Sequence, residues 1–336
     1  MGNKVTIALD AFGGDNAPLE IVKGAAEYAG TDPGSHIILV GKKDVLNDIL
    51  KENDIGLSNL SVYNADDVIE TTEHPVKAIR AKKDSSMVKA LELVKHGEAD
   101  AMLSAGNSGA LLVGAQTIVG RIRGVDRACL APIVPTLKGP AVIVDGGANV
   151  DARAEWLRQW AIMGSVYMEK MFSINSPAVG IINIGAEEEK GNKLVQDTFA
   201  LLKEEKDLNF IGSVEARDIP ESQADVMVCD AFVGNVVLKM YEGVAKTLVS
   251  EIKKAIMSGT ASKIGGMLIK KSLKGVLSTY NPAKYGGATL LGTKSPVVKG
   301  HGNSEAEQIK IALEHTATTV RKNIVANIAE NIDIAE

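Results

Sequence analysis

The sequence predicts a three-layer α/β/α protein with a central, mostly parallel sheet between two layers of helices. Short apolar, β-branched runs alternate with longer segments of helical period, the pattern of parallel strands joined by crossover helices. Several short runs are apolar throughout, as expected where helices bury both faces of a strand. The 336 residues, 45% of them hydrophobic, can bury a large core.

The elements follow this alternation along the chain. The expected strands are residues 5–9, 37–40, 60–63, 101–104, 141–144, 178–184, 210–211 and 226–229. The expected helices between and after them are residues 19–29, 44–52, 76–82, 87–95, 154–171, 188–204 and 305–329. No repeat or linker divides the chain, so we expect residues 1–336 to form one domain.

One segment breaks the α/β rhythm. Residues 236–257 and 262–280 are expected to be two long helices that leave the sheet as an excursion spanning 236–280. In the second helix Ile264, Met267 and Leu268 share one face, while lysines gather elsewhere. Such a basic amphipathic helix is typical of a membrane-surface or partner-binding element. The alternative is that its apolar stripe packs only against a second subunit.

Composition excludes several classes of protein. Lys and Arg number 37 and Asp and Glu number 42, so the net charge of −5 offers no general attraction to nucleic acid. Cys129 and Cys229 are far apart in apolar surroundings, which indicates neither a disulfide framework nor a metal site. The apolar run near the N-terminus is too short for a signal peptide, and no run is long enough for a membrane span. We therefore expect a cytoplasmic protein, either soluble or bound to a membrane surface.

Polar, glycine-rich loops follow five of the expected strands. In a parallel sheet the carboxyl ends of the strands share one edge, so we expect these loops to converge on one site. Glycine allows close backbone approach and helix starts can hold anions, which makes phosphate the natural ligand. The alternative is that they are ordinary turns. The loops are residues 10–15, 104–109, 145–151, 183–185 and 230–235.

Familiar cofactor motifs are missing from the sequence. There is no G-x-G-x-x-G after the first strand, no P-loop and no G-x-S-x-G nucleophile elbow. The five histidines show no metal-ligand spacing. The sequence therefore predicts neither an organic cofactor nor a protein-bound metal.

Six loop segments follow one another in order along essentially the whole chain. They are ALDAFGGDNAP at 8–18, SAGNSGAL at 104–111, DGGANVDA at 145–152, NIGAEEEKGN at 183–192, CDAFVGNVVLK at 229–239, and YGGATLLG with KGHGNS within 285–304. Together these segments resemble the phosphate acyltransferases of bacterial phospholipid synthesis. Departures are mild: Phe12, Gly146 and Ala152 stand where the family's Met, Val and Cys are expected.

The resemblance implies a reaction and a set of partners. A long acyl chain would move from acyl carrier protein to inorganic phosphate, giving acyl phosphate without an organic cofactor. The fold would be similar to those of phosphate acetyltransferases and isopropylmalate dehydrogenases, with a projecting helical hairpin that helps to form a homodimer. The tip of that hairpin, with Ile264, Met267 and Leu268, would contact an anionic membrane on the inner face of the cell membrane. A downstream glycerol-3-phosphate acyltransferase would be a further partner, and nucleic acid would not.

This chemistry calls for an anion site and donors, not for a strong base. Phosphate is already largely dianionic near neutral pH, because the second pKa of a phosphate monoester is about 6 and that of the free ion is similar. The first group of candidates for binding it and for stabilising the oxyanion lies at the end of the strand at 101–104, with a cation from the helix at 76–82. This group comprises Ser104, Asn107, Ser108 and Gly109, with Arg80 or Lys82 supplying charge. The alternative for Ser104 and Asn107 is helix capping.

Other candidates come from the remaining loops. His301 could protonate the leaving thiolate or orient the carbonyl, or it could belong to a turn before the last helix. Carboxylates would repel phosphate, so they are expected to brace cations, orient loop N–H groups or contact pantetheine; they are Asp10, Asp15, Asp145, Asp151 and Asp230. The loop glycines Gly13 and Gly14 complete the expected substrate-binding set. Polar residues that could meet phosphate or thioester are Asn149, Lys190, Asn192 and Asn235. Phe12 and Phe232 are expected in the core, the alternative being contact with the acyl chain.

Other functions compete with this hypothesis. A short-chain phosphate acyltransferase using coenzyme A would need the same loops. A dehydrogenase on the same fold should show metal-binding aspartates spaced D-x-x-x-D, and none is convincing. A non-catalytic membrane scaffold that recruits carrier protein would leave the phosphate-type loops unexplained.

Overall fold

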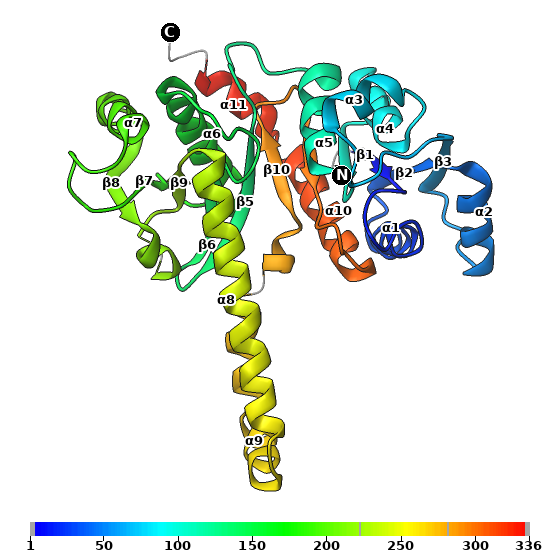
Figure 1. The fold of residues 1–336 in the computed structure, drawn as a ribbon. Helices are drawn as coiled ribbons and strands as arrows, with labels where there is room; N and C mark the ends of the chain where they lie inside the picture. The colour runs from blue at the N-terminus through cyan, green and yellow to red at the C-terminus, as the bar shows by residue number, and fades with distance from the viewer. Residues whose placement is uncertain (1–3, 222, 281, 333–336) are drawn as a thin grey trace.

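The computed structural model describes residues 4–221, 223–280 and 282–332, and Figure 1 shows a sheet flanked by helices. Within these residues eleven strands form one sheet in the order β3-β2-β1-β4-β11-β10-β5-β6-β9-β7-β8. The strands are β1 (Val5–Asp10), β2 (Ser35–Gly41), β3 (Leu60–Asn64), β4 (Ala101–Ser104), β5 (Cys129–Thr136), β6 (Gly139–Val144), β7 (Ala178–Asn183), β8 (Asn209–Glu215), β9 (Val226–Val228), β10 (Ala288–Leu291) and β11 (Val297–Lys299).

The sheet consists of two parallel halves that run in opposite directions. Strands β3, β2, β1, β4 and β11 are parallel to one another, as are β6, β9, β7 and β8. Between them, the antiparallel pairings β11·β10, β10·β5 and β5·β6 reverse the direction three times. The expectation of a mostly parallel sheet is confirmed. The expectation that all five glycine loops share one edge is wrong, because the carboxyl ends of the two halves point to opposite edges.

Helices cover both faces of the sheet and supply the hairpin. The helices are α1 (Leu19–Thr31), α2 (Lys43–Glu52), α3 (Pro75–Ala81), α4 (Ser86–Lys95), α5 (Ser108–Gly114), α6 (Ala154–Phe172), α7 (Lys193–Glu204), α8 (Ala231–Met257), α9 (Thr260–Thr279), α10 (Ala306–Arg321) and α11 (Ile324–Ile332). Short helical turns are the π-helix Ala115–Val119, which continues α5, and the 3-10 turns Ala216–Glu221 and Pro282–Tyr285.

The first half of the sheet alternates its side chains between two cores. Ile7, Leu9 and Leu103 pack towards α1 and α10. Ala8 and Met102 point the other way and pack towards α3, α4 and α5. This alternation, which follows from the two-residue repeat of a strand, decides which face each strand-end residue occupies.

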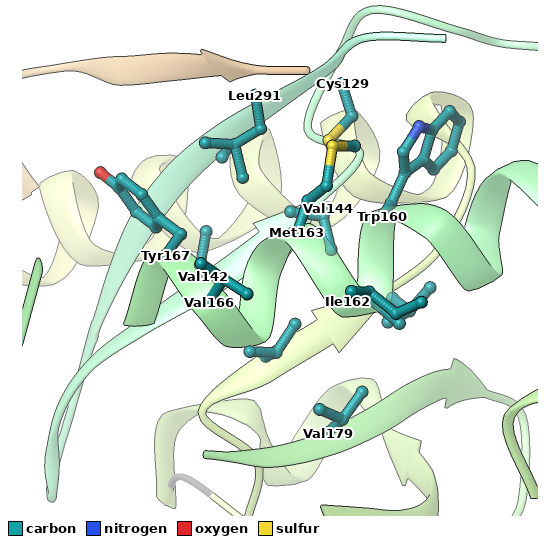
Figure 2. Close-up of a cluster of buried hydrophobic side chains, with 14 of the residues drawn as sticks. Cys129, Val142, Val144, Trp160, Ile162, Met163, Val166, Tyr167, Val179 and Leu291 are labelled. Atoms are coloured by element: carbon teal, nitrogen blue, oxygen red, sulfur yellow. The ribbon is translucent and has the colours of Figure 1, made fainter. Parts of the chain in front are cut away.

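The second half buries its largest side chains beneath α6. Trp160 and Tyr167 of α6 are fully buried, and Figure 2 shows them among strand residues such as Val142 and Leu291. The opposite face of this half is covered by the first turns of α8, where Val237 and Leu238 pack on the sheet. Each half of the sheet is thus a middle layer between apolar helix faces, as the three-layer prediction requires.

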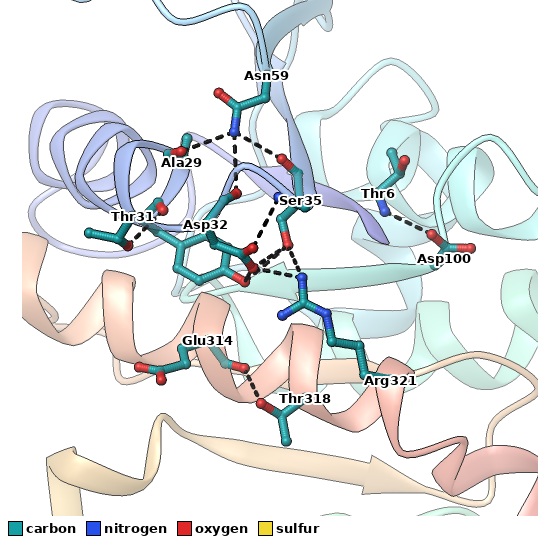
Figure 3. Close-up of polar contacts among 12 residues, drawn as sticks. Thr6, Ala29, Thr31, Asp32, Ser35, Asn59, Asp100, Glu314, Thr318 and Arg321 are labelled. Atoms are coloured by element: carbon teal, nitrogen blue, oxygen red, sulfur yellow. Dashed lines mark hydrogen bonds and ion pairs between the residues drawn. The ribbon is translucent and has the colours of Figure 1, made fainter. Parts of the chain in front are cut away.

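A polar cluster joins three elements at one edge of the first half. The Asp32 carboxylate accepts hydrogen bonds from Tyr28, Ser35 and Arg321 at 2.7, 2.8 and 2.7 Å (Figure 3). Burial opposes the charge of Asp32, but these donors prevail and lower its pKa to about 2. The cluster fixes the end of α1, the start of β2 and the end of α10 to one another.

The hairpin of α8 and α9 projects from the α/β body, as Figure 1 shows in yellow. The two helices meet closely at Gly266, where an added Cβ would lie 2.3 Å from the Ile256 side chain. Large apolar side chains remain exposed along α8, among them Val236, Met240 and Val244. In the described parts of the chain, no helix combines the length and apolar character needed to cross a membrane.

Several boundaries differ from the sequence expectations. Three strands were not expected: β5 holds Pro132 and Pro135, which weaken a strand prediction, and β10 and β11 are very short. The expected helix 188–204 begins only at Lys193, and α8 begins at Ala231. The expected helix 305–329 is two helices, because Asn323 adopts φ of 50° between α10 and α11.

Candidate active site

Three polar residues form a row at the carboxyl ends of neighbouring strands β1, β4 and β11. Leu9 pairs with Leu103, so Asp10 and Ser104 come next in register, and Lys299 pairs with Ser104. All three lie on the face of the sheet that α4 and α5 cover, because Ala8, Met102 and Val297 two residues earlier pack there. We call Asp10, Ser104 and Lys299 the Lys299 row.

Within the row, Asp10 and Ser104 are buried and hydrogen-bonded to each other, whereas Lys299 is partly exposed. Ser104 Oγ donates to Asp10 Oδ2 at 2.6 Å and accepts from the Gly106 N–H at 3.0 Å. Burial raises the pKa of Asp10, while the Ser104 hydrogen bond and the charge of Lys299 act in the opposite direction. Both Ser104 and Asp10 are thus engaged within the protein.

Lys299 is the cation of the row. Its Nζ donates to the carbonyl of Ala105 at 3.1 Å and also to that of Gly300. Burial lowers its pKa to about 8, a shift that Asp10 and Asp15 oppose and that the positive charge of Lys239 increases. An ammonium carries three N–H groups, so these two carbonyls leave capacity for a ligand.

Glycine is needed where the loops after β1 and β4 meet. A Cβ on Gly13 would lie 2.6 Å from Asp10 Oδ2, 2.7 Å from the Gly106 nitrogen and 2.9 Å from Ser104 Oγ. Gly14 has a φ of 110°, and its Cβ would lie 2.9 Å from the Gly302 carbonyl. The two loops therefore pack backbone to backbone, as the sequence motif suggests.

Two residues of α8 lie near the end of β11 and the loop that follows it. Asn235, Lys239 and Glu242 are spaced i, i+4 and i+7, which places them on the same side of the helix. Lys239 is near enough to affect the Lys299 pKa, and Glu242 Oε1 lies 4.0 Å from His301 Nε2. The structure thus adds Lys239 near Lys299, places the candidate His301 near Glu242, and puts the candidate Asn235 one turn before Lys239 on the same side of α8.

A narrow apolar cavity adjoins Lys299. Its volume is about 10 Å³, roughly the room that one water molecule needs. Lys299 and Ser108 contribute to its wall, and Ser108 is exposed. The remaining lining residues are Leu111, Leu112, Leu130, Leu290 and Val297. The Lys299 ammonium and the Ser108 hydroxyl therefore lie at the edge of this cavity, which we call the apolar seam.

Comparison with known proteins identifies the family. A family model described as "Fatty acid synthesis protein" matches residues 5–327. The chain belongs to this family. The phosphate acyltransferase of Clostridium botulinum (strain ATCC 19397 / Type A) is 48% identical over 326 residues, covering 97% of each chain. That of Clostridium acetobutylicum is 43% identical over 327 residues, covering 97% of this chain and 98% of the relative. These relatives confirm the resemblance seen in the sequence.

Solved structures confirm the fold. A phosphotransacetylase from Streptococcus pyogenes superposes with a TM-score of 0.63 at 17% identity, covering 94% of both chains. The EutD phosphotransacetylase from Staphylococcus aureus gives a TM-score of 0.59 at 17% identity, with the same coverage. At this identity the likeness concerns the fold alone.

The loop after β6 is held by hydrogen bonds to a single carboxylate. The Asp145 carboxylate accepts from the backbone N–H groups of Leu130, Gly147, Ala148 and Asn149 at 2.8 to 3.0 Å. The Asn149 side chain donates to Asp145 at 2.7 Å and to the Ala128 carbonyl at 2.9 Å. We call this the Asp145 loop. Its polar groups orient the loop, one of the roles predicted for the aspartates.

Gly146 in the Asp145 loop packs closely against a neighbouring strand. A Cβ at this position would lie 2.3 Å from Cγ of Pro132 and 3.2 Å from Leu238. The Val expected from the resemblance would therefore not fit against Pro132 without a shift of the backbone.

Three candidates are helix caps. The side chain of Asn107 accepts from the Ala110 N–H at 3.0 Å and donates to the carbonyls of Glu70, Thr71 and Glu73. Asp230 accepts from the Val233 N–H, and Asn192 from the Val195 N–H. These contacts match the capping role that was the alternative for Asn107.

Other candidates lie away from the row. Lys82 Nζ donates to Glu73 at 2.7 Å and to the Val68 carbonyl at 2.6 Å, so it braces the segment before α3. Arg80 lines a groove between α3, α4 and α5. Lys190 is exposed in the loop after β7, a strand that lies five positions from β11, about 24 Å along the sheet. The structure does not bring Lys190 or Asn192 to the row.

The remaining expected residues are at the periphery of these loops. Asp15 is exposed, and its backbone N–H donates to the Gly302 carbonyl at 2.7 Å. Gly109 packs on Pro75, and Asp151 is exposed beyond the Asp145 loop. Phe12 packs in the core as expected, whereas Phe232 is 64% exposed, so the core expectation for Phe232 is wrong. In the described ranges, no group of three or more His, Cys, Asp or Glu side chains could hold a metal ion.

Lys299 and Lys239 are functional candidates that sequence reasoning missed. Both lie within quoted motifs, KGHGNS and CDAFVGNVVLK, and Lys299 directly follows two valines. The sequence feature that could have indicated Lys299 is a lysine at the end of a short apolar run. Its meaning depends on β11 lying next to β4, which the local sequence does not show.

Proposed function

We propose that the protein transfers a long acyl group from acyl carrier protein to inorganic phosphate, giving acyl phosphate for phospholipid synthesis. The family and the named relatives support phosphate acyl transfer. The observation that carries the proposal for this chain is the partly buried cation Lys299 beside an apolar cavity. Acyl phosphate joins the same two chemistries, a phosphate and a hydrocarbon.

Phosphate binds between Lys299 and Lys239 in this proposal. The two positive charges repel each other, which contributes to the lowered pKa of Lys299. A dianion between them removes that repulsion and gains charge-assisted hydrogen bonds. The exposed hydroxyl of Ser108 is a further donor at the same cavity.

The reaction then needs no added base. An oxygen of HPO₄²⁻ attacks the thioester carbonyl carbon, the new C–O bond forms, and the C–S bond breaks. The proton of HPO₄²⁻ ends on the departing thiolate, so acyl phosphate and a free thiol result. Lys299 holds the nucleophile and stabilises the developing negative charge. His301, on the same side as Glu242 of α8, is the candidate that passes the proton to sulfur.

The acyl chain follows the apolar seam beside Lys299. The cavity is too narrow for several methylene groups as it stands, so Leu111 and Leu112 of α5 must turn aside to admit them. Cα positions need not move for such rotamer changes. Widening of the seam on binding is therefore part of the proposal.

The activity is tested by trapping acyl phosphate with hydroxylamine. Palmitoyl-(acyl carrier protein) and phosphate should give the hydroxamate without added nucleotide. Acetyl coenzyme A, supplied as the alternative substrate, should react far more slowly. A preference for acetyl coenzyme A would instead establish the short-chain phosphate acyltransferase.

The proposal includes a dimer on the inner face of the cell membrane. Exposed Val236, Met240 and Val244 offer α8 an apolar stripe for a second copy. Near the tip, Ile264, Met267 and Leu268 are 53%, 68% and 82% exposed. Exposed lysines at 263, 270 and 271 would attract anionic lipid. Attachment there would deliver acyl phosphate to a downstream glycerol-3-phosphate acyltransferase in the membrane.

Membrane contact is tested by changing Ile264, Met267 and Leu268 to Ser together. Co-sedimentation with phosphatidylglycerol vesicles should be lost, while the dimer and turnover in solution persist. The matched control changes three exposed apolar residues of the α/β body, Leu19, Val45 and Ile211. A monomeric tip variant would assign the stripe to the subunit interface.

A further inference from the structure

A broad groove runs between α3, α4 and the helix that begins at Ser108. Its volume is about 620 Å³, and its apolar floor includes Val76 of α3 with Val113 and Ile118 from α5 and its π-helical continuation. Val76 is 37% exposed, so part of this floor faces solvent. The groove lies outside the Lys299 row and has no role in the reaction described above.

The rim of the groove is positively charged. Arg80, Lys83 and Lys95 line it and are exposed, and Glu92 is the acidic residue in its lining. Glu92 is already paired with Lys89 at 3.5 Å. In the described part of the chain, no carboxylate forms an ion pair with the three rim cations, although the whole protein carries a net charge of −5. The local surplus of positive charge is therefore available to a partner.

From this floor and rim we infer that the groove docks an acidic amphipathic helix of the carrier protein that brings the acyl group. This inference rests on the proposed function. An apolar stripe on such a helix covers the floor, and its carboxylates meet the rim cations. A flat lipid surface does not fill a concave groove, and an apolar floor does not suit a phosphate backbone.

The groove and the proposed reaction site share one helix. Val113 and Ile118 follow Ser108 by five and ten residues, which corresponds to about 7 to 15 Å along the helix. A thioester on a flexible arm can cross that distance from a docked carrier protein to the cavity beside Lys299. The position of the groove thus suits delivery of the substrate, not only binding.

The test reverses two rim charges and measures binding directly. Acyl carrier protein is titrated against wild type, Lys83→Glu/Lys95→Glu and the control Lys43→Glu/Lys51→Glu, whose exposed lysines lie on α2. Arg80 stays unchanged because it was also a candidate substrate ligand. The groove variant should bind at least tenfold more weakly at low salt, and the control within about twofold. The difference should shrink at high salt, since ions screen exposed charges.

Turnover separates docking from chemistry. The groove variant should show a raised KM for acyl-(acyl carrier protein) with kcat unchanged, and unaltered rates with the small thioester acyl-pantetheine. Thermal melts check folding, and Lys83→Gln/Lys95→Gln provides a milder variant. Equal binding by groove and control variants overturns the inference, as does absence of carrier-protein binding by wild type. Selective loss of vesicle binding would also overturn it.

Failure of the proposed function gives a different result. If wild type binds carrier protein but forms no acyl phosphate, the proposed reaction fails. Loss of that binding in the groove variant alone would still support the docking site.

Discussion

Two buried aspartates, Asp10 and Asp145, end strands of the same sheet in different surroundings. Burial raises the pKa of both. Asp145 is surrounded by four backbone N–H groups and an amide, so its bonding capacity is spent on its own loop. Asp10 bonds chiefly to Ser104 and lies near Lys299, whose ammonium retains capacity for a ligand. The comparison indicates that a saturated carboxylate builds a scaffold, whereas an incompletely bonded row provides a site.

Among these tests, removal of the Lys299 ammonium should have the largest effect on turnover. Lys299→Ala should reduce acyl phosphate formation by about 10²–10³-fold, because one preorganised donor is removed where charge develops. Turnover at saturating carrier protein, with phosphate varied, is the measurement. The control is Lys294→Ala, which changes an exposed lysine in the loop between β10 and β11 and should retain activity. Comparable activity in the two variants would remove Lys299 from the site.

Substitution of Asp145 should lower the stability of the protein and leave its turnover largely unchanged. Asp145→Ala leaves four partly buried or exposed backbone N–H groups without this acceptor, so the free energy of unfolding should fall by about 2 kcal/mol. Urea unfolding measures this, and the folded fraction should keep turnover within a few-fold. Asp151→Ala, at an exposed position just beyond the loop, should change stability by less than about 0.5 kcal/mol. A large fall in turnover without unfolding would give Asp145 a direct role.

The titration of Lys299 provides a milder test. Its ammonium is charged below a pKa of about 8 and loses its proton above it. Phosphate binding should therefore weaken by about fivefold between pH 8 and pH 9, seen as a rise in the KM for phosphate. Lys299→Arg, which stays charged, should lack this step. An unchanged step in that variant would assign the titration to another group.

Asn107 should give the smallest effect on turnover, because its side chain caps α5 and bonds the backbone before α3. Asn107→Ala should lower the free energy of unfolding by about 1–2 kcal/mol, because it removes the cap and these bonds to carbonyls. Asn192→Ala, which removes the corresponding cap of α7 far from the row, is the matched control. Similar stability losses with similar turnover are expected from thermal melts and hydroxylamine trapping. A loss of 10²-fold or more in turnover for Asn107→Ala alone would make Asn107 an oxyanion or phosphate donor.

Local patterns predicted much of the fold but only part of the site. Strand β1 and helix α1 are recognisable because their apolar spacing is strong. Strand β5 is not, because Pro132 and Pro135 interrupt the pattern. The reversal of direction between the two halves depends on the pairing of β10 with β11 and β5 and of β5 with β6, which local sequence patterns do not show. Asp145 could be predicted to orient its loop, since that bonding is local, whereas Lys299 acquires its neighbours from distant parts of the chain.

The position of β11 between β4 and β10 also sets an order of events during synthesis. Strands β1 to β4 leave the ribosome long before Val297–Lys299, so one edge of β4 has no partner until nearly the whole chain is made. An open strand edge invites pairing with other chains. When β11 pairs with β4, the sheet is completed and the Lys299 ammonium is placed beside Ser104 in one late step. A nascent or truncated chain that ends before β11 would therefore lack both the strand that joins β4 to β10 and the Lys299 ammonium. Under the proposed function, such an incomplete chain could not transfer acyl groups.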